Sequence, residues 1–268
     1  YYYPSILQMK IAVVGKGGVG KTTIAAGLAR FIGREGYNVI AIDADPSLNL
    51  AVSVGIPHDI AEKAPILFNE EEFIRSRTIL SNNIYIMNPK VDDVVEKFGI
   101  KGPDNVTVIK FGEVKKAGSR CLCPEYAFLR ALLSHLILGR KDVVILDMVA
   151  GLEPLSRGTI KNIDLMLCVV EPSIKAIDVA LKMEKFANEV GVKKIEIVAN
   201  KIKKEEDIIN IEKNLQKKLF HYIPYDESVI EADACGISLI DFKPSSPAVR
   251  ALEQLKKKIL MYLKQKSI

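Results

Sequence analysis

The sequence predicts a doubly wound α/β fold, in which a mostly parallel sheet carries helices on both faces. Seven short apolar runs rich in β-branched residues alternate with segments whose apolar residues recur at helical spacing. Several runs are apolar throughout, which is typical of strands buried on both faces of a parallel sheet. With 49% hydrophobic and 26% charged residues among 268, the chain can bury the single large core that this fold needs.

The predicted strands lie at residues 11–14, 38–42, 84–87, 106–111, 143–148, 165–170 and 195–199. An amphipathic helix is expected at 126–138, whereas 69–77 and 92–105 are expected to be surface excursions between core elements. Because neither a repeat nor a Pro/Gly-rich linker divides the chain, residues 9–268 are expected to form one domain. Residues 1–8 precede a methionine and are expected to be a tag remnant or disordered.

The 38 Lys and Arg residues exceed the 33 Asp and Glu residues by five, and an excess of that size lies at one end of the chain. Residues 250–268 hold six basic residues and one acidic residue, so the remainder is neutral in sum and no nucleic-acid partner is expected. Leucines and isoleucines recur there at helical spacing, without Trp or Phe. We expect a last helix packed on the sheet; a helix lying on a membrane surface is the alternative.

Four cysteines are too few for a disulfide scaffold, and no apolar run approaches eighteen residues. A cytoplasmic protein without membrane spans is therefore expected.

The strongest chemical signal directly follows the first predicted strand. It fits the G-x-x-x-x-G-K-[ST] phosphate loop and comprises Gly15, Lys16, Gly17, Gly18, Val19, Gly20, Lys21, Thr22 and Thr23. Glycines allow successive backbone N–H groups to converge on phosphate oxygens, and the following helix adds the positive end of its dipole. Lys21 is expected to neutralise the β- and γ-phosphates, and the Thr22 hydroxyl to ligate Mg²⁺. A glycine-rich turn with a solvated lysine is the alternative.

Lys16, directly after the first glycine, makes this loop resemble the KGGVGKTT loop of the MinD/ParA class of dimeric ATPases, which includes the nitrogenase iron protein and several metal-insertion ATPases. The resemblance implies a P-loop fold of the MinD and iron-protein type that hydrolyses ATP to ADP. It also implies a homodimer that forms on ATP binding, in which Lys16 reaches the partner's nucleotide. From the residues alone, a cation beside Lys21 would repel it unless phosphate or a partner carboxylate intervened. A solvent-facing loop lysine is the alternative.

Two aspartates end the second predicted strand, where open α/β sheets bind their ligands. The resemblance implies that Asp43 helps to hold Mg²⁺ through water and that Asp45 orients or activates the attacking water. Metal-bridged phosphates leave the protein mainly positioning and electrostatics to supply, which suits carboxylates at this place. The alternative is that one of them caps the next helix.

Asp147 follows the apolar run 143–146, which is the pattern of a Mg²⁺-associated carboxylate in P-loop ATPases. Residues 148–151 then supply small side chains where the chain passes the γ-phosphate, so this stretch is interpreted as the second switch. A buried strand that ends in a turn aspartate is the alternative.

Asn200 and Lys201 follow another strand, but the next two residues lack the aspartate that guanine-specific NKxD sites use. We therefore expect ATP rather than GTP. The resemblance implies that Asn200 hydrogen-bonds the adenine edge and that the loop 223–226, with Pro224, lines the base pocket. Asn200 as a plain turn residue is the alternative.

Cys121 and Cys123 form a C-x-C pair ahead of the predicted helix at 126–138. In a cytosolic ATPase such a pair is more naturally metal-binding or redox-active than structural. Two thiolates cannot close a tetrahedral sphere, but a twofold axis would bring four together, and four sulfurs suit Zn²⁺, an Fe–S cluster or square-planar Ni²⁺. We expect a Ni²⁺ or Zn²⁺ site shared across the dimer.

Together with the residues 147–159 and the motifs at 88–93 and 171–173, the C-x-C pair makes the chain resemble the CooC family. Its members are ATPases that assist nickel insertion into carbon monoxide dehydrogenase, so the resemblance implies that enzyme as the client. Two departures stand out. Leu122 lies where the family usually has Gly or Ala, and residues 153–157 lack the histidine of the family's EHLGRGT motif, which puts any role of that histidine in doubt.

Two other functions stay open. An iron–sulfur reductase like the nitrogenase iron protein would bridge its subunits with a cluster, although the cysteine ligands of that family lie far apart in sequence. A MinD/ParA-type positioning ATPase would bind membrane or DNA instead of metal. His58, His135 and His221 share no ligand spacing with the cysteines and are expected to be structural, whereas Cys168 and Cys235 are expected to be small core or near-core residues.

Overall fold

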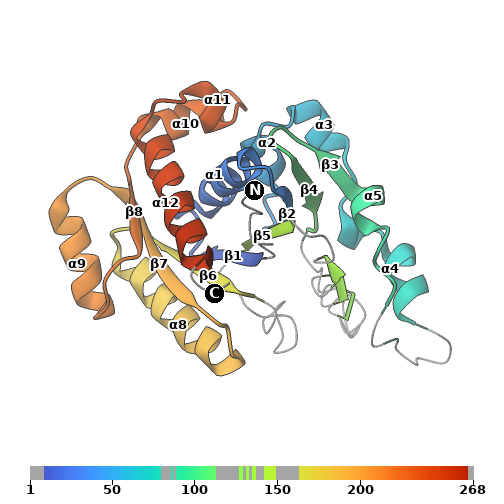
Figure 1. Ribbon diagram of the computed structural model, residues 1–268, viewed down its shortest axis with the longest axis horizontal. Helices are drawn as coiled ribbons and strands as arrows, with labels where there is room; N and C mark the ends of the chain where they lie inside the picture. The colour runs from blue at the N-terminus through green and yellow to red at the C-terminus, as the bar shows by residue number, and fades with distance from the viewer. Residues whose placement is uncertain are drawn as a thin grey trace, which may run out of the picture.

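The computed structural model describes residues 9–79, 86, 89–112, 127–128, 131–132, 135–136, 142–148 and 163–264. In this part of the chain the strands form one eight-stranded sheet in the order β3-β4-β2-β5-β1-β6-β7-β8, and only β3 runs antiparallel to its neighbour (Figure 1). The strands are β1 (Met9–Gly15), β2 (Asn38–Ala44), β3 (Gly99–Lys101), β4 (Val106–Lys110), β5 (Asp142–Met148), β6 (Leu165–Val170), β7 (Ile195–Ile202) and β8 (His221–Pro224). The predicted doubly wound, mostly parallel sheet is confirmed.

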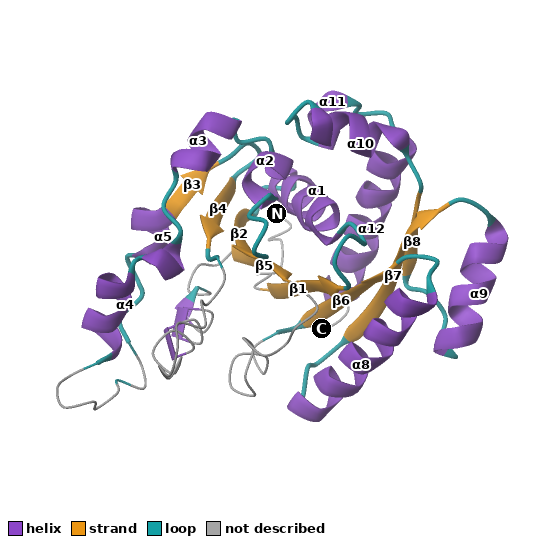
Figure 2. Cartoon of the chain, turned by 180° about the vertical axis from the view of Figure 1, so that it is seen from behind, coloured by secondary structure: helices purple, strands orange, loops and turns teal. Residues whose placement is uncertain are grey.

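Helices cover both faces of this sheet (Figures 1 and 2). One face carries α1 (Lys21–Arg34), α2 (Leu50–Val54), α3 (His58–Lys63), α10 (Glu227–Ala234), α11 (Leu239–Phe242) and α12 (Pro247–Lys264). The other face carries α4 (Glu71–Thr78), α5 (Val94–Phe98), α8 (Ile174–Val190), α9 (Glu205–Leu215) and helical residues within 127–135. A short 3₁₀ turn, Leu67–Asn69, precedes α4.

The central strand β1 shows why its sequence is apolar throughout. Ile11 and Val13 belong to the core beneath α1, whereas Ala12 and Val14 belong to the core beneath α8. All seven residues of β1 are buried, as expected for a strand covered on both faces.

The last helix packs on the fold, as predicted. Leu252, Leu255 and Ile259 of α12 are at most 1% exposed, and α12 lies against α1 and β8. Lys256, on the same helix, pairs with Glu35 after α1. No described helix has both the length and the apolar character that crossing a membrane requires.

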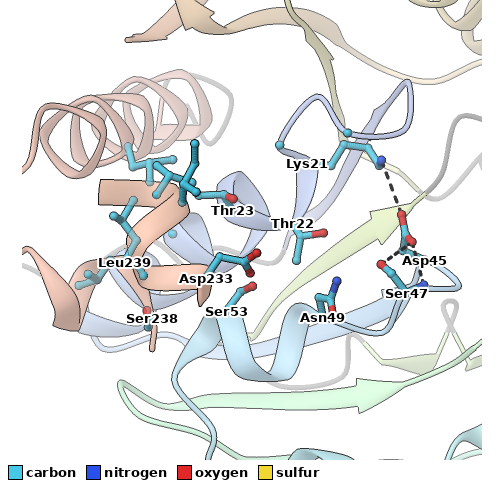
Figure 3. Close-up of a pocket in the computed structure, with 18 of the residues that line it drawn as sticks. Lys21, Thr22, Thr23, Asp45, Ser47, Asn49, Ser53, Asp233, Ser238 and Leu239 are labelled. Carbon is cyan, nitrogen blue, oxygen red and sulfur yellow. Dashed lines mark hydrogen bonds and ion pairs between the residues drawn. The ribbon is translucent and has the colours of Figure 1, made fainter. Parts of the chain in front are cut away.

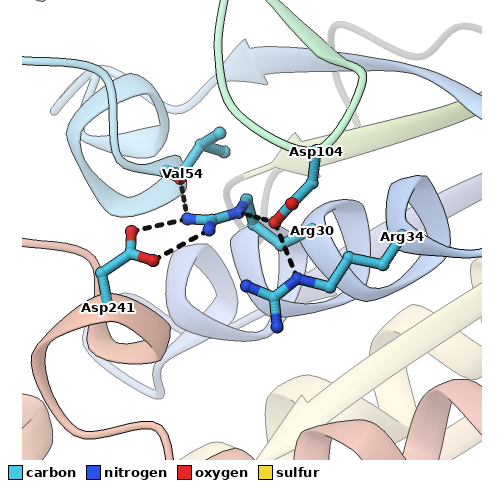
Figure 4. A network of polar contacts seen from close by, with 5 residues as sticks. All are labelled: Arg30, Arg34, Val54, Asp104 and Asp241. Atoms are coloured by element: carbon cyan, nitrogen blue, oxygen red, sulfur yellow. Dashed lines mark hydrogen bonds and ion pairs between the residues drawn. The ribbon is translucent and has the colours of Figure 1, made fainter.

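Arg30 ties three further segments to the middle of α1 (Figure 4). Its Nη1 and Nη2 donate to the two carboxylate oxygens of Asp241 at 2.8 and 2.9 Å, and Nη1 also donates to the Val54 carbonyl at 2.8 Å. Its Nε donates to Asp104, which also accepts from Arg34. Burial acts to lower the pKa of Arg30, but the hydrogen bonds to the two carboxylates outweigh it and hold that pKa above its ordinary value. The network fixes α2, α11 and the β3–β4 loop around α1.

Several predictions about individual segments differ from the structure. The segments expected to be surface excursions contain α4, whose Ile74 is 1% exposed, and α5 with the edge strand β3. Strand β8 was not predicted, because its four residues include a histidine and end in proline. Of the predicted strand 84–87 only Ile86 is described, and its N–H bonds to Thr78 outside the sheet. The helix predicted at 126–138 is confirmed at the described residues 127–128, 131–132 and 135, whereas Leu136 lies in a bend.

The cysteines and histidines are placed as follows. Cys168 is buried in β6 as predicted, but the prediction for Cys235 is wrong, because it lies exposed at the end of α10. His221 is buried, and its Nε2 lies 2.8 Å from the Ala251 carbonyl, which holds β8 to α12. His58 is exposed beside Glu62 on α3.

Candidate functional site

The phosphate loop lies where the strand order of the sheet reverses. The chain leaves β1 towards β2 on one side, and later crosses from β5 to β6 on the other side of β1. In open α/β sheets, such a switch point at the carboxyl ends of the strands is where ligands bind. Asp43, Asp147 and Asn200, at or near the carboxyl ends of β2, β5 and β7, are brought to the same edge.

The conformation of the loop explains its glycines. Gly18 and Gly20 have φ of 82° and 93°, in the left-handed region that favours glycine. A Cβ at Gly20 would lie 2.2 Å from Nδ2 of Asn200, so no larger residue fits there. Asn200 Nδ2 in turn donates to the Val19 carbonyl at 2.8 Å, and Lys201 Nζ donates to the Gly18 carbonyl at 2.6 Å. The pair 200–201 therefore braces the phosphate loop.

This bracing changes the interpretation of Asn200. One of the two N–H groups of its side-chain amide is engaged by the loop, which leaves the second N–H and Oδ1 for other partners, and the contact with the adenine edge stays a prediction. Pro224 ends β8, and Asp226 caps α10 by accepting from the Ser228 backbone N–H at 3.0 Å. The other oxygen of Asp226 accepts from the backbone N–H of Ala248, in the first turn of α12, at 3.0 Å.

Lys21 and Thr22 open helix α1 at the phosphate loop (Figure 3). The Lys21 side chain is 4% exposed, and its Nζ lies 3.4 Å from the Lys16 carbonyl and 3.6 Å from Oδ2 of Asp45. Thr22 Oγ1 donates to Oδ2 of Asp147 at 2.5 Å. Both side chains thus contact a carboxylate that belongs to one of the two predicted switches.

Asp43 and Asp147 are register neighbours on β2 and β5, and both are fully buried. Asp43 accepts from the backbone N–H of Leu50, the first residue of α2, at 2.8 Å. Asp45 instead accepts from the N–H and hydroxyl of Ser47, at 3.0 and 2.7 Å. The capping role left open for one of the two aspartates is therefore filled by Asp43.

Burial raises the pKa of Asp43 to about 7 and that of Asp147 to about 6, and only part of this rise is offset by hydrogen bonds from Leu50 and Thr22. Among the described residues, Oδ1 of Asp147 is one of two buried side-chain oxygens without a hydrogen-bond partner. Oxygen ligands suit Mg²⁺, which retains several waters in nucleotide sites. An unpartnered carboxylate oxygen beside a threonine hydroxyl on a phosphate loop therefore fits Mg²⁺, with Thr22, Asp43 and Asp147 as the residues that would hold it.

A cavity of about 600 Å³ opens beside the loop, a size typical of small-ligand sites. Thr23 of α1, Asn49 and Ser53 line one side, and Asp233 of α10 with Ser238 and Leu239 at α11 line the other (Figure 3). This α10–α11 wall could not be predicted from the sequence, because these two short helices carry no motif. Lys201 lines the cavity, whereas Asn200 and Pro224 are not among its described lining residues, and the nucleotide contacts expected of all three stay predictions.

Glu171 is a second residue that sequence reasoning passed over as a site residue. It directly follows β6, and its carboxylate lies 3.8 Å from Lys16 Nζ and 3.1 Å from Lys201 Nζ. The available signal was its position, because an acidic residue at the end of a parallel strand shares the edge with Asp43 and Asp147.

Cys121 and Cys123 lie outside the described residues, as does the second switch beyond Met148. Within the described ranges, no three His, Cys, Asp or Glu side chains are grouped to hold a metal ion. The helix that follows the cysteines is anchored by Phe128, which is fully buried and meets Phe73 of α4 edge to face at 6.0 Å.

Comparison with known proteins gives consistent matches. Residues 10–240 match the family described as the CobQ/CobB/MinD/ParA nucleotide binding domain. The carbon monoxide dehydrogenase accessory protein CooC of Rhodospirillum rubrum is 39% identical, with 88% of this chain and 91% of that protein covered. An uncharacterized ATP-binding protein of Methanocaldococcus jannaschii is 40% identical, with 93% and 95% covered. Among solved structures, the cell division ATPase MinD of Pyrococcus furiosus has the same fold, with a TM-score of 0.71, 21% identity, and 96% and 100% covered.

Proposed function

Because this chain belongs to the CobQ/CobB/MinD/ParA nucleotide-binding family and, within it, to the CooC family, we propose that it uses ATP hydrolysis to assist nickel insertion into carbon monoxide dehydrogenase. It is a P-loop ATPase, and its cofactors are ATP or ADP and Mg²⁺. The observation that carries the proposal is the similarity to CooC over 88% of the chain, combined with the C-x-C pair in the sequence.

The nucleotide chemistry follows from the residues at the carboxyl edge. Mg²⁺ bound to the phosphates supplies charge neutralisation. Gly15–Gly20 present backbone N–H groups to the phosphates. In the proposed reaction Lys21, whose Nζ lies 3.6 Å from Oδ2 of Asp45, exchanges this carboxylate for the γ-phosphate, which carries more negative charge. Asp45 is then available to orient the attacking water.

The proposal includes a homodimer that forms on ATP binding and in which Lys16 contacts the partner's nucleotide. Lys16 is 37% exposed at the carboxyl edge of the sheet, so it is accessible to a second chain. Cys121 and Cys123 of two chains would together provide four thiolates for Ni²⁺ or Zn²⁺, the cargo of the reaction.

The test is the metal content of anaerobically purified protein, with and without MgATP, measured together with its native mass. We expect ATP to convert the chain to a dimer, and a Cys121→Ser/Cys123→Ser double variant to lose stoichiometric metal while it keeps nucleotide binding. Cys235→Ser is the matched control, because that thiol is exposed on α10 and should leave the metal content unchanged. Retained nickel or zinc in the double variant contradicts the metal site, and iron with a brown colour would favour an iron–sulfur reductase.

A further inference from the structure

The two lysines of the phosphate loop are both paired with carboxylates of their own chain. Lys21 lies 3.6 Å from Asp45, and Lys16 lies 3.8 Å from Glu171. Two neighbouring cations repel each other unless anions intervene, and here the chain supplies both anions itself. In the proposed reaction the γ-phosphate displaces Asp45 from Lys21. By analogy, an anion should also displace Glu171 from Lys16.

The fold places Glu171 between its two lysines. Strand β6 pairs with β1 on one side and with β7 on the other, so the residue after β6 lies between the loop after β1 and the end of β7 (Figure 1). Lys201 Nζ lies 3.1 Å from Oε2 of Glu171 and also donates to the Gly18 carbonyl at 2.6 Å. The carboxylate is therefore anchored to the phosphate loop through Lys201.

The two contacts of Glu171 differ in strength. Its contact with Lys201 is a hydrogen bond of 3.1 Å, and Lys201 is also held by the Gly18 carbonyl, whereas its contact with Lys16 is an ion pair of 3.8 Å. The two lysine side chains are similarly exposed, 37% for Lys16 and 42% for Lys201, so the difference lies in the distances and in the second bond of Lys201. Exposed ion pairs of this kind contribute little and exchange readily. Of the two lysines that contact Glu171, Lys16 is therefore the one that is less firmly held. Another anion can replace Glu171 as its partner.

We propose that Glu171 is a positioning residue that holds Lys16 to its own chain until a phosphate of the partner's nucleotide replaces the carboxylate. This inference rests on the ATP-dependent dimer of the proposed function. A carboxylate next to a phosphate loop repels nucleotide phosphates unless lysines neutralise it, so its presence there opposes premature assembly. Formation of one dimer breaks two Lys16–Glu171 pairs, one in each chain. The cost of breaking them raises the protein concentration that is needed for dimerisation with ATP.

The test compares Glu171→Gln with Glu189→Gln in sedimentation velocity with a non-hydrolysable ATP analogue and Mg²⁺. Glutamine at 171 removes the charge but can still accept from Lys201. Glu189 is exposed near the other end of α8, about 22 Å along the helix from its start, so it is a control with the same charge change. We expect the dimer dissociation constant of Glu171→Gln to fall by about three- to tenfold relative to wild type, with Glu189→Gln unchanged. An equal or weaker dimer in Glu171→Gln overturns the proposal.

A second readout examines the pair in the single chain. In the nucleotide-free protein, the rate at which an amine-acetylating reagent modifies Lys16, followed by mass spectrometry, should rise about two- to fivefold in Glu171→Gln and not in Glu189→Gln. The gain should shrink at high salt, which screens exposed pairs. An unchanged rate overturns the pairing itself. If the wild type shows the pairing but never dimerises with the analogue, the dimer of the proposed function fails and the role of Glu171 in assembly fails with it.

Discussion

Helix α1 carries two polar clusters that differ in whether the chain satisfies them. In the middle of the helix, Arg30 bonds to both oxygens of Asp241, to Asp104 and to the Val54 carbonyl. In the first turn, Thr22 contacts one oxygen of Asp147, while the other oxygen is buried without a partner. Arg30 and Asp147 are both buried, at 3% and 0% exposure, so the burial of these two groups does not explain the difference.

The difference separates a structural role from a functional one. Buried polar groups normally find partners within the protein, and those that do not are candidates for ligand binding. In the Arg30 cluster, all three nitrogens of the guanidinium have hydrogen-bond partners within the protein, and these bonds hold α2 and α11 in place. The Asp147 cluster leaves one carboxylate oxygen without a partner, which Mg²⁺ fills in the proposed function. Substitutions in the two clusters should therefore change stability in opposite directions.

The largest expected effect is on turnover. Lys21→Gln should lower ATP hydrolysis by more than about 100-fold, because it removes the cation that faces the transferred phosphate. Steady-state phosphate release measures this. Lys175→Gln, at an exposed position of α8, should keep the wild-type rate. A Lys21→Gln rate within tenfold of wild type would contradict the assignment of the site.

The largest loss of stability is expected in the middle of α1. Arg30→Leu should lower the free energy of unfolding by about 2–4 kcal/mol, because it strands partly buried carboxylates and the Val54 carbonyl. Arg34→Leu is a matched control: the same helix presents it to Asp104, but its side chain is 42% exposed, so the loss should stay below about 1 kcal/mol. Urea titration of both variants decides, and equal losses would refute a structural role specific to Arg30.

Asp147→Asn should have the opposite effect on stability. At about pH 8 the nucleotide-free variant should be about 1–2 kcal/mol more stable than wild type, because a buried charge without full solvation is removed. Its Mg²⁺-dependent turnover should nevertheless fall at least tenfold. Asp178→Asn, exposed on α8, should change neither quantity. A less stable Asp147→Asn would show that the carboxylate is structural.

The smallest expected effect is the pH dependence of the free energy of unfolding that arises from Asp147. Because burial raises the pKa of Asp147 to about 6, the folded chain holds a proton that the unfolded chain releases above about pH 4. The stability of the nucleotide-free protein therefore falls as pH rises from about 4 to about 6 on account of this group. The stability gained in Asp147→Asn should be near zero at about pH 4 and constant above about pH 7. A gain that does not vary with pH would contradict the raised pKa.

The sequence predicted the parts of the fold whose strands are apolar throughout, such as β1, β5 and β6. It did not predict β3 and β8, because these edge strands have three and four residues and their pairing depends on neighbours elsewhere in the sheet. The last helix was predicted correctly because its apolar stripe is long.

For the site, motifs at strand ends identified the phosphate loop, Asp43 and Asp147. These motifs do not predict which hydrogen-bond partner each polar side chain has in the folded protein. Asn200 lies 181 residues from Val19, and Glu171 belongs to a strand that becomes a neighbour of β1 only in the folded sheet. The exposed position of Cys235 was missed for the same reason, since helix ends follow from packing.

The central claim, that ATP turnover serves nickel delivery, is tested most directly by activating a nickel-deficient carbon monoxide dehydrogenase. The nickel-loaded chain is mixed with that enzyme, and carbon monoxide oxidation is followed with MgATP or with a non-hydrolysable analogue. We predict recovery of activity with MgATP only, and none with the Cys121→Ser/Cys123→Ser variant. Equal recovery with the analogue, or with the double variant, would contradict the account.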